Sequence, residues 1–280
     1  KIIIFDNFSS GKHWFLENSK KIKIIKGDIK NYNFLKKSMK KVEVVFHFAA
    51  NPDIAAAVKN PDIDFIEGTL LLRNVLEAMR ENKIKKIIFS SGSGVYGDLG
   101  KKYAFEKKTI TNPISTYGAS KLYCESLISA YNNLVDIRGV SFRFANVIGE
   151  NTTHGVCYDF VKKKIKNKKK IEVMGDGSQS KSYLHISDVV QGLFFALKKN
   201  FKTHQIFNMS TKDYLSVKEI LNLVLKEMNI KKIKKIFQKS SRGWKGDVPI
   251  VRLNDDKLRK YWNNRLSTKQ AIKKTVEFLI

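Results

Sequence analysis

The sequence has few cysteines, no long apolar segment and no glycine-rich phosphate loop. Its two cysteines, Cys124 and Cys157, form neither a disulfide framework nor a cluster with the spacing of metal ligands. No apolar run reaches 18 residues, the minimum expected of a membrane-spanning helix. No segment reads G-x-G-x-x-G or G-x-x-G-x-x-G after a predicted strand. We therefore expect a cytoplasmic protein with two reduced thiols, no metal and no membrane partner.

Acidic residues are scarce relative to basic ones. Lys and Arg together number 53 against 26 Asp and Glu, which gives a formal net charge of +27. The excess is mostly lysine and is spread along the whole chain, whereas arginine would be expected to dominate a site that binds phosphate in a bidentate manner. The composition favours a solvated surface over a specific nucleic-acid site, and attraction of an anionic substrate is the third interpretation.

Apolar, β-branched runs alternate with helical patterns in the first half of the chain. Short runs with little polar alternation are typical of buried strands, and their alternation with helices predicts an α/β fold with a doubly wound parallel sheet. The clearest helical pattern covers Ile63–Arg80. After Gly149 the strands become shorter, which predicts a smaller C-terminal α/β lobe. We expect a first domain at residues 1–149 and a substrate lobe at residues 150–280, folded as one unit. The expected strands are Ile2–Phe5, Ile22–Lys26, Val42–Phe48, Lys86–Phe89, Val140–Phe144, Ile171–Met174, Gln205–Met209 and Ile233–Phe237.

Acidic or small residues follow the first three predicted strands. Asp6 ends the first strand, where a dinucleotide-binding fold places the acid that accepts hydrogen bonds from the adenosine ribose, and a carboxylate there favours NAD over NADP. The alternative is that Asp6 and Asn7 only shape a turn. Asp28 either reaches an adenine amino group or caps the helix that begins near Asn31. Ala49 would let the backbone approach a cofactor, or would pack a tight corner.

A tyrosine and a lysine lie four residues apart in "STYGASKLYCESL". If this segment is helical, Tyr117 and Lys121 lie on one face, and the ammonium would favour the phenolate form of the tyrosine. Tyr117 could then act as a general base. The upstream segment "IIFSSGSGVYGD" ends a predicted strand, where sites in open α/β sheets lie, and offers the Ser91 and Ser93 hydroxyls. In a lysine-rich chain, the same spacing in an ordinary helix is the alternative.

Eight motifs occur in an order that resembles the extended short-chain dehydrogenase/reductase family, and within it the nucleotide-sugar epimerases and dehydratases. The resemblance covers the whole chain and is closest to UDP-glucose 4-epimerases. It implies a Rossmann-type NAD domain and a sugar-nucleotide lobe. The motifs are "DNFSSG", "GDI", "FHFAA", "SSGSGVYGD", "YGASK", "RFANVIG", "GDGSQSKSYLHISDV" and "GWKGDVP".

The resemblance also implies roles for individual residues. Tyr117 is the base and Lys121 its partner, Ser91 or Ser93 supplies a hydroxyl, and NAD passes a hydride to and from the sugar C4. The implied cofactor-binding residues are Asp6, Asn7, Ser9, Ser10, Asp28, Ile29, Phe48, Ala49, Ala50, Tyr117, Lys121 and Ala145. The implied substrate-binding residues are Ser93, Asn146, Lys181, Arg242, Trp244 and Asp247. Trp244 stands where the family has an arginine, for which Arg242 or Lys245 would substitute.

The sequence departs from the family at several of these motifs. Gly92 stands where the family usually has Ser or Thr, and Phe65 stands where it often has Asn. Gly92-Ser93-Gly94 replaces the Thr-Asp-Glu of the dehydratases, which argues against dehydration. The first strand and its glycine-rich loop are missing, so we expect an N-terminally truncated sequence. A variant of the hypothesis is that this 280-residue form cannot hold NAD and is inactive, because the pyrophosphate loses a helix N-terminus.

Three functional hypotheses follow. The first is an NAD-dependent nucleotide-sugar 4-epimerase acting on a UDP-sugar, and the second is a dehydratase or reductase of the same family. The third is a non-catalytic protein that keeps the fold and binds a polyanion through its basic surface. Family relatives pair through two helices from each subunit, so the resemblance implies a homodimer built on the predicted helices Ile63–Arg80 and Ser115–Ala130.

Overall fold

A computed structural model of the chain describes residues 1–164, 170–244 and 246–280. It divides into two compact units that interleave along the sequence. Unit 1 comprises residues 1–91, 116–141 and 200–206, and unit 2 comprises residues 92–115, 142–199 and 207–280. The sequence predicted a single boundary after residue 149, whereas in the structure the chain passes between the units several times.

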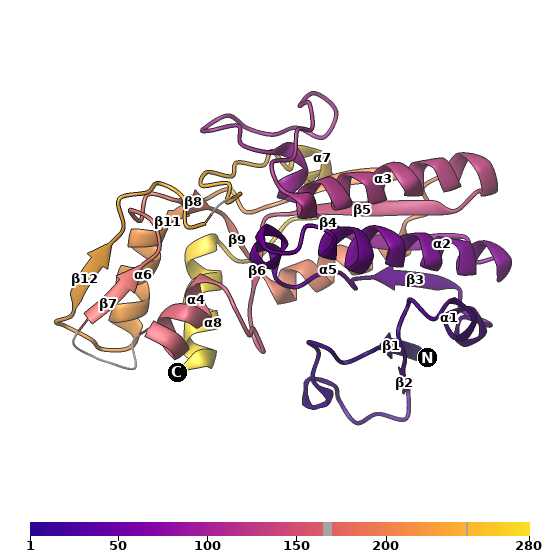
Figure 1. The fold of residues 1–280 in the computed structure, drawn as a ribbon, viewed down its shortest axis with the longest axis horizontal. Helices are drawn as coiled ribbons and strands as arrows, with labels where there is room; N and C mark the ends of the chain where they lie inside the picture. Colours follow the sequence, from indigo (N-terminus) through magenta and orange to yellow (C-terminus); the bar gives the residue numbers. More distant parts are fainter. Residues whose placement is uncertain (165–169, 245) are drawn as a thin grey trace. The chain divides into compact units, whose positions relative to one another are not determined.

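A two-stranded parallel sheet opens unit 1. Strand β1 (Ile2–Asp6) pairs with β2 (Ile22–Lys26), and α1 (Tyr32–Ser38) follows them (Figure 1). Both strands carry exposed or half-buried residues, including Ile2 at 57% exposure. The expectation of strands buried on both faces is therefore wrong for β1 and β2, because in the described residues they pair only with each other.

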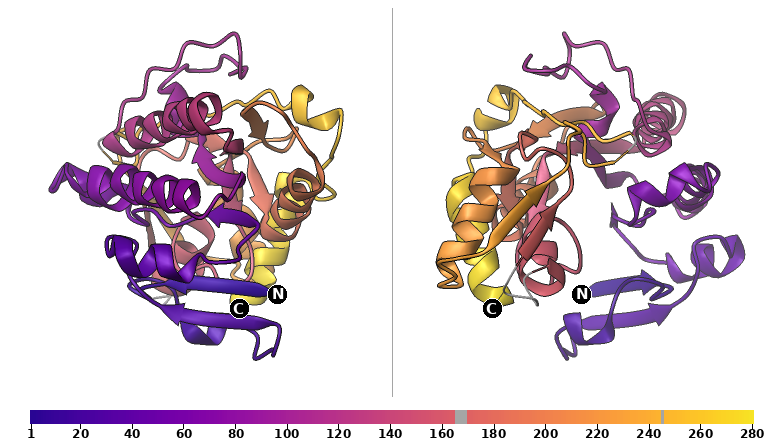
Figure 2. Two further views of the ribbon diagram at one scale, coloured as in Figure 1. Left: turned by 90° about the vertical axis from the view of Figure 1, so that its right-hand side faces the viewer. Right: turned by 60° about the vertical axis from the view of Figure 1, so that its left-hand side comes forward.

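A four-stranded sheet has the order β3-β4-β5-β10, with helices α2 and α3 in unit 1 packed beside β4. Residues Ile87 and Phe89 of β4 share a core with Val75 of α2 and Ile128 of α3. Helices α2 and α3 run alongside one another in both views of Figure 2. The doubly wound α/β class is confirmed. The bounds are Val44–His47 (β3), Leu71–Glu81 (α2), Lys86–Gly92 (β4), Thr116–Val135 (α3), Arg138–Phe144 (β5) and Gln205–Met209 (β10).

A π-helical turn precedes α2 and sets how closely it approaches α3. The helix predicted for Ile63–Arg80 begins as the turn Phe65–Leu70 and becomes α-helical only at Leu71. A Cβ on Gly68 would lie 2.5 Å from Ser120 Oγ, and Ser120 also shares a 3.0 Å hydrogen bond with Thr69. Glycine at position 68 therefore permits a close contact between this turn and the first turns of α3.

Unit 2 is built from short strand pairs and helices around a second core. Strands β6 and β9 pair in parallel, as do β7 and β12, while β8 and β11 are antiparallel. Its core includes Ile171, Ile220, Leu221, Ile272 and Val276. The bounds are Asn146–Ile148 (β6), Val156–Tyr158 (α4), Lys170–Val173 (β7), Ser180–Lys181 (β8), Tyr183–His185 (β9), Ile186–Lys198 (α5), Leu215–Ser216 (β11), Val217–Glu227 (α6), Lys234–Phe237 (β12), Asp256–Arg259 (α7) and Thr268–Leu279 (α8).

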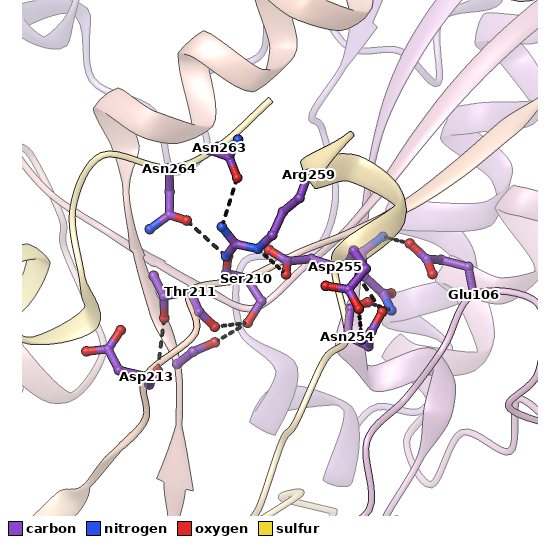
Figure 3. A network of polar contacts seen from close by, with 12 residues as sticks. Glu106, Ser210, Thr211, Asp213, Asn254, Asp255, Arg259, Asn263 and Asn264 are labelled. Carbon is purple, nitrogen blue, oxygen red and sulfur yellow. Dashed lines mark hydrogen bonds and ion pairs between the residues drawn. The ribbon is translucent and has the colours of Figure 1, made fainter. Parts of the chain in front are cut away.

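A polar network fixes α7 to the segment after β10 within unit 2 (Figure 3). Arg259 Nε donates to Asp255 Oδ1 at 2.7 Å, and Arg259 Nη2 donates to the Ser210 carbonyl at 3.3 Å. Asn254 Nδ2 donates to Asp256, while the Asn254 carbonyl accepts from Asn208. Because Asp255 and Ser210 are buried, the Arg259 contacts satisfy Asp255 Oδ1 and the Ser210 carbonyl, whereas Asp255 Oδ2 is buried without a hydrogen-bond partner among the described residues. No helix in the described residues has the length and apolarity of a membrane span.

Candidate functional site

The Tyr–Lys pair lies in the first two turns of α3. Both side chains lie on one face of the helix, as the spacing predicted. Lys121 is buried, its Nζ donates to the Ser90 carbonyl at 2.8 Å, and it lies 5.4 Å from the centre of the Tyr117 ring. Nζ also lies 4.9 Å from the Phe89 ring. The ammonium is thus held against the end of β4 and over the faces of two aromatic rings.

The electrostatics of the pair differ from the expectation of an activated phenol. Burial, with a contribution from the negative charge of Asp64, raises the pKa of Tyr117 to about 12. Burial lowers the pKa of Lys121 to about 8, although Cys124, Asp64 and Glu125 act in the opposite direction. Removal from water penalises the phenolate and the ammonium alike. In this structure, near neutral pH, Tyr117 is a phenol and most of Lys121 is charged.

The hydroxyl of Ser91 is engaged elsewhere in unit 1. Ser91 Oγ donates to Glu125 Oε1 at 2.5 Å, and both side chains are buried. Ser93 begins a short 3-10 turn, Ser93–Tyr96, and is partly exposed. Gly92 has an extended backbone (φ −156°), and a Cβ built on it meets nothing within 4 Å. The backbone at position 92 therefore accommodates a side chain, although none is present.

Two buried polar residues that the sequence reasoning missed lie next to the pair. Asp64 precedes the π-helical turn and is 2% exposed. Its carboxylate accepts from Asn51 Nδ2 at 2.9 Å and from Thr116 Oγ1 at 2.7 Å, and Thr116 is the residue before Tyr117. Glu125 was also missed, although its position four residues after Lys121 places it on the same helix face.

The acids after β1 and β2 are both engaged in turns. Asp6 Oδ1 accepts from the Phe8 amide at 2.6 Å, so Asp6 shapes the turn after β1, and its role toward a ribose stays a prediction. Asp28 accepts from the Lys30 amide and from Asn7 Nδ2, so the structure brings Asp28 and Asn7 together. Although desolvation opposes it, these hydrogen bonds and the Lys30 ammonium hold the pKa of Asp28 below its ordinary value. The alternative that Asp28 caps α1 is wrong, because the cap is Asn31.

The other predicted cofactor residues occupy loops or strand ends. Ser9, Ser10, Phe48 and Ala49 are exposed, whereas Ala50 is half-buried. The Ile29 carbonyl accepts from Asn74 Nδ2, which joins the loop after β2 to α2. Ala145 is buried in unit 2, and its amide donates to the Met209 carbonyl at 2.9 Å.

Four of the predicted substrate residues converge in unit 2. Lys181 Nζ lies 2.8 Å from Asp247 Oδ1, and the Gly243 amide donates to Asp247 Oδ2. Arg242 donates to the Asp247 carbonyl and, at 2.6 Å, to Asp98 Oδ2, while the Asp247 amide donates to the Trp244 carbonyl. The cationic groups of Lys181 and Arg242 are therefore paired with carboxylates.

Two other predicted substrate residues lie outside this cluster, and one lies beyond the described chain. Asn146 begins β6 and Ser93 begins its 3-10 turn, and neither shares a hydrogen bond with the cluster within the described residues. Lys245 lies outside the described residues.

Comparison with known proteins shows the family of this chain. The model of the NAD dependent epimerase/dehydratase family matches residues 1–210. A protein of Methanocaldococcus jannaschii named "Putative UDP-glucose 4-epimerase" is 32% identical over 99% of this chain and 90% of its own length. The chain belongs to the NAD dependent epimerase/dehydratase family.

Two further relatives carry different sugar names. The UDP-glucuronate 4-epimerase of Thermodesulfobacterium geofontis is 28% identical over 95% of this chain and 83% of its own length. The crystal structure of UDP-glucose 4-epimerase with UDP-glucose from Thermotoga maritima is 26% identical, covers 99% of this chain and 89% of that chain, and has a TM-score of 0.89. The fold and family are shared, whereas the sugar differs among the relatives.

Proposed function

We propose that this protein is an NAD-dependent nucleotide-sugar epimerase that inverts C4 of a UDP-sugar through a transient 4-keto intermediate. The observation that carries the proposal is the Tyr117/Lys121 pair on α3, held against the end of β4 by the Lys121–Ser90 hydrogen bond. Sites in open α/β sheets lie at these carboxyl ends. The membership of the epimerase/dehydratase family supports the same reaction.

In the proposed reaction Tyr117 takes the proton of the sugar 4-hydroxyl and later returns it. A bound NAD would supply a reversible hydride acceptor for C4 of the sugar. At neutral pH a tyrosine with a pKa of about 12 is almost entirely in the phenol form, which already holds its proton and cannot act as a base. The pKa of Tyr117 must therefore fall in the reacting complex. A positive charge brought close to the phenol has that effect, and Lys121 is held on the same helix face to add to it.

The residues present fit two parts of NAD. Asp6 ends β1 with a carboxylate, which suits a ribose diol better than a 2′-phosphate, and Asp28 lies beside Asn7 at the end of β2. Tyr117 and Lys121 suit the nicotinamide ribose. The 280-residue sequence itself supplies no glycine-rich turn for the pyrophosphate.

Unit 2 supports a substrate with a negatively charged nucleotide. Lys181, Arg242 and the loop around Trp244 form a polar cluster, and their counter-ions are Asp247 and Asp98. A diphosphate that binds there must replace these ion pairs, since each cation already has a carboxylate partner. Ser93 is the proposed catalytic hydroxyl, because Ser91 is bonded to Glu125.

The central experiment compares two matched tyrosine variants with NAD and UDP-glucose, UDP-galactose or UDP-glucuronate. We expect the wild type to form the C4 epimer and Tyr117→Phe to be at least about 100-fold slower, the usual size of lost general acid–base catalysis. Tyr123→Phe, an exposed tyrosine on the same helix, is the control and should keep its rate. A Tyr117→Phe variant as fast as the wild type would refute the mechanism.

The same assays separate the alternatives. A 4-keto-6-deoxy product would indicate a dehydratase, and net oxidation of NADH would indicate a reductase. Salt-sensitive nucleic-acid binding without any NAD binding would favour the non-catalytic hypothesis motivated by the +27 charge. The proposed assembly is a homodimer in the cytoplasm, and sedimentation equilibrium tests its mass.

A further inference from the structure

A buried carboxylate lies beside the Tyr117/Lys121 pair without being part of it. Asp64 is 2% exposed and is separated from α3 by more than fifty residues of sequence. A carboxylate is rarely buried unless hydrogen bonds or a cation compensate its desolvation. Here Asn51 Nδ2 donates to one oxygen at 2.9 Å, and Thr116 Oγ1 donates to the other at 2.7 Å.

These hydrogen bonds fix the start of α3. Asn51 is itself held, since it donates to the Asp53 carbonyl at 2.8 Å and accepts from the Asp53 amide at 2.9 Å. The loop after β3 therefore positions Asp64, and Asp64 positions Thr116, the residue directly before Tyr117. The neighbouring Phe65, which stands where the family often has Asn, is 59% exposed, so the polar contact with Thr116 comes from Asp64.

We propose that Asp64 is a positioning residue of the Tyr117/Lys121 pair, anchoring Thr116 and placing one negative charge beside the pair. The proposal concerns the site assigned under the proposed function and rests on it for its catalytic meaning. The charge and the contacts exist in the protein whether or not it epimerises a sugar, so they are testable separately.

The charge has a defined effect on both members of the pair. The negative charge of Asp64 raises the pKa of Tyr117 and opposes the fall in the pKa of Lys121. The other titratable groups that face the pair are Cys124 and Glu125 on α3 and His47 at the end of β3. Among them, Asp64 is the acid that contacts the start of α3 from outside the helix and affects both pKa values.

The test is Asp64→Asn, which removes the charge and keeps the shape. The new amide can accept from Asn51 and donate to Thr116, because a hydroxyl both donates and accepts. Asp53→Asn is the matched control. It removes a nearby charge, but Asn caps the turn Ile54–Val58 as well as Asp does. Thr116→Val removes the hydrogen bond while the charge stays.

The first readout does not depend on activity. In protein carrying ¹³C-labelled lysine, we expect Lys121 to titrate near pH 8, apart from ordinary lysines at about 10.4, and Lys121→Met identifies its signal. We expect Asp64→Asn to lower the Lys121 midpoint by roughly one unit, the size of one charge acting through a partly buried environment. Asp53→Asn and Thr116→Val should leave it within roughly 0.3 units, less than a third of that effect.

The second readout is the pH profile of kcat/KM for epimerisation. Without the charge, the phenolate forms more easily, so the acidic limb of Asp64→Asn should move to lower pH, and Thr116→Val should lower kcat without moving it. An unchanged Lys121 midpoint in folded Asp64→Asn, or an equal shift in Asp53→Asn, overturns the proposal. If Asp64→Asn does not fold, Asp64→Ser gives the same readout. A shifted midpoint in an enzyme without epimerase activity would refute the proposed function alone.

Discussion

His47 is expected to make unit 1 sensitive to acid. It ends β3, is 3% exposed and stacks against the Phe89 ring at 5.9 Å. Burial, with the nearby Lys121 ammonium, lowers the pKa of His47 to about 3. An unfolded chain protonates this imidazole near pH 6.5, whereas the folded chain does not. Between these values the unfolded state binds the extra proton, so stability falls as pH falls.

The size of the effect follows from the two pKa values. With about 6.5 for the unfolded state and about 3 for the folded state, His47 alone removes about 2 kcal/mol of stability between pH 7 and pH 5. Replacing it by Phe keeps a flat ring beside Phe89 and removes the titrating group. We therefore expect His47→Phe to lose about 2 kcal/mol less than the wild type over this pH range, whatever its stability at pH 7.

The assay is urea unfolding at pH 7, 6 and 5, followed by a signal from unit 1, with midpoints compared across pH. His13→Phe is the control, because His13 is exposed and its replacement removes a histidine without changing the core. The proton spectrum of the folded protein gives a second measurement, since the His47 ring signals should not shift between pH 7 and pH 5. A His47 signal that titrates near pH 6.5, or an unchanged pH slope in His47→Phe, would refute the reasoning.

Two further predictions concern the serines after β4. Gly92→Ser should fold normally, since a Cβ at this position meets nothing within 4 Å. The variant should raise kcat several-fold, because it restores a hydroxyl where the family usually has one. A slower but equally stable variant would contradict this prediction. Ser91→Ala should lower unfolding stability by about 1.5–3 kcal/mol, because the buried Glu125 carboxylate loses a donor, while Ser93→Ala should change it by less than about 0.5 kcal/mol. An unaltered stability together with a large loss of kcat in Ser91→Ala would instead make Ser91 the catalytic hydroxyl.

The parts of the fold that local sequence determines were predictable. The strands β4 and β5 and the start of the helix α3 were found within a few residues of their predicted bounds, because the apolar runs and the helical spacing there are unambiguous. The two-residue strands β8 and β11 were not predicted, since such pairs form only when distant segments meet. The π-helical turn at Phe65–Leu70 was missed for a similar reason, since it depends on the close contact of Gly68 with Ser120.

The same distinction applies to the candidate site, where residues within one helix were predictable and contacts between distant segments were not. Tyr117 and Lys121 were recognisable because both lie within one helix, and Glu125 was within reach of the same spacing. The role of Asp64 depends on Thr116, fifty-two positions along the chain, and no periodicity connects them. No sequence pattern indicates the Ser91–Glu125 hydrogen bond, which distinguishes Ser91 from Ser93 as the candidate catalytic hydroxyl.

The electrostatics of the pair limit when it can take a proton. At neutral pH the structure holds Tyr117 as a phenol, because burial and the charge of Asp64 both act against the phenolate. Lys121, with a pKa of about 8, keeps most of its charge only because nearby acids offset part of its desolvation. Asp64 therefore favours the charged form of Lys121 and, at the same time, disfavours the phenolate form of Tyr117. In the proposed reaction, Tyr117 can therefore take a proton only after further positive charge arrives, which would confine proton abstraction to the fully assembled complex.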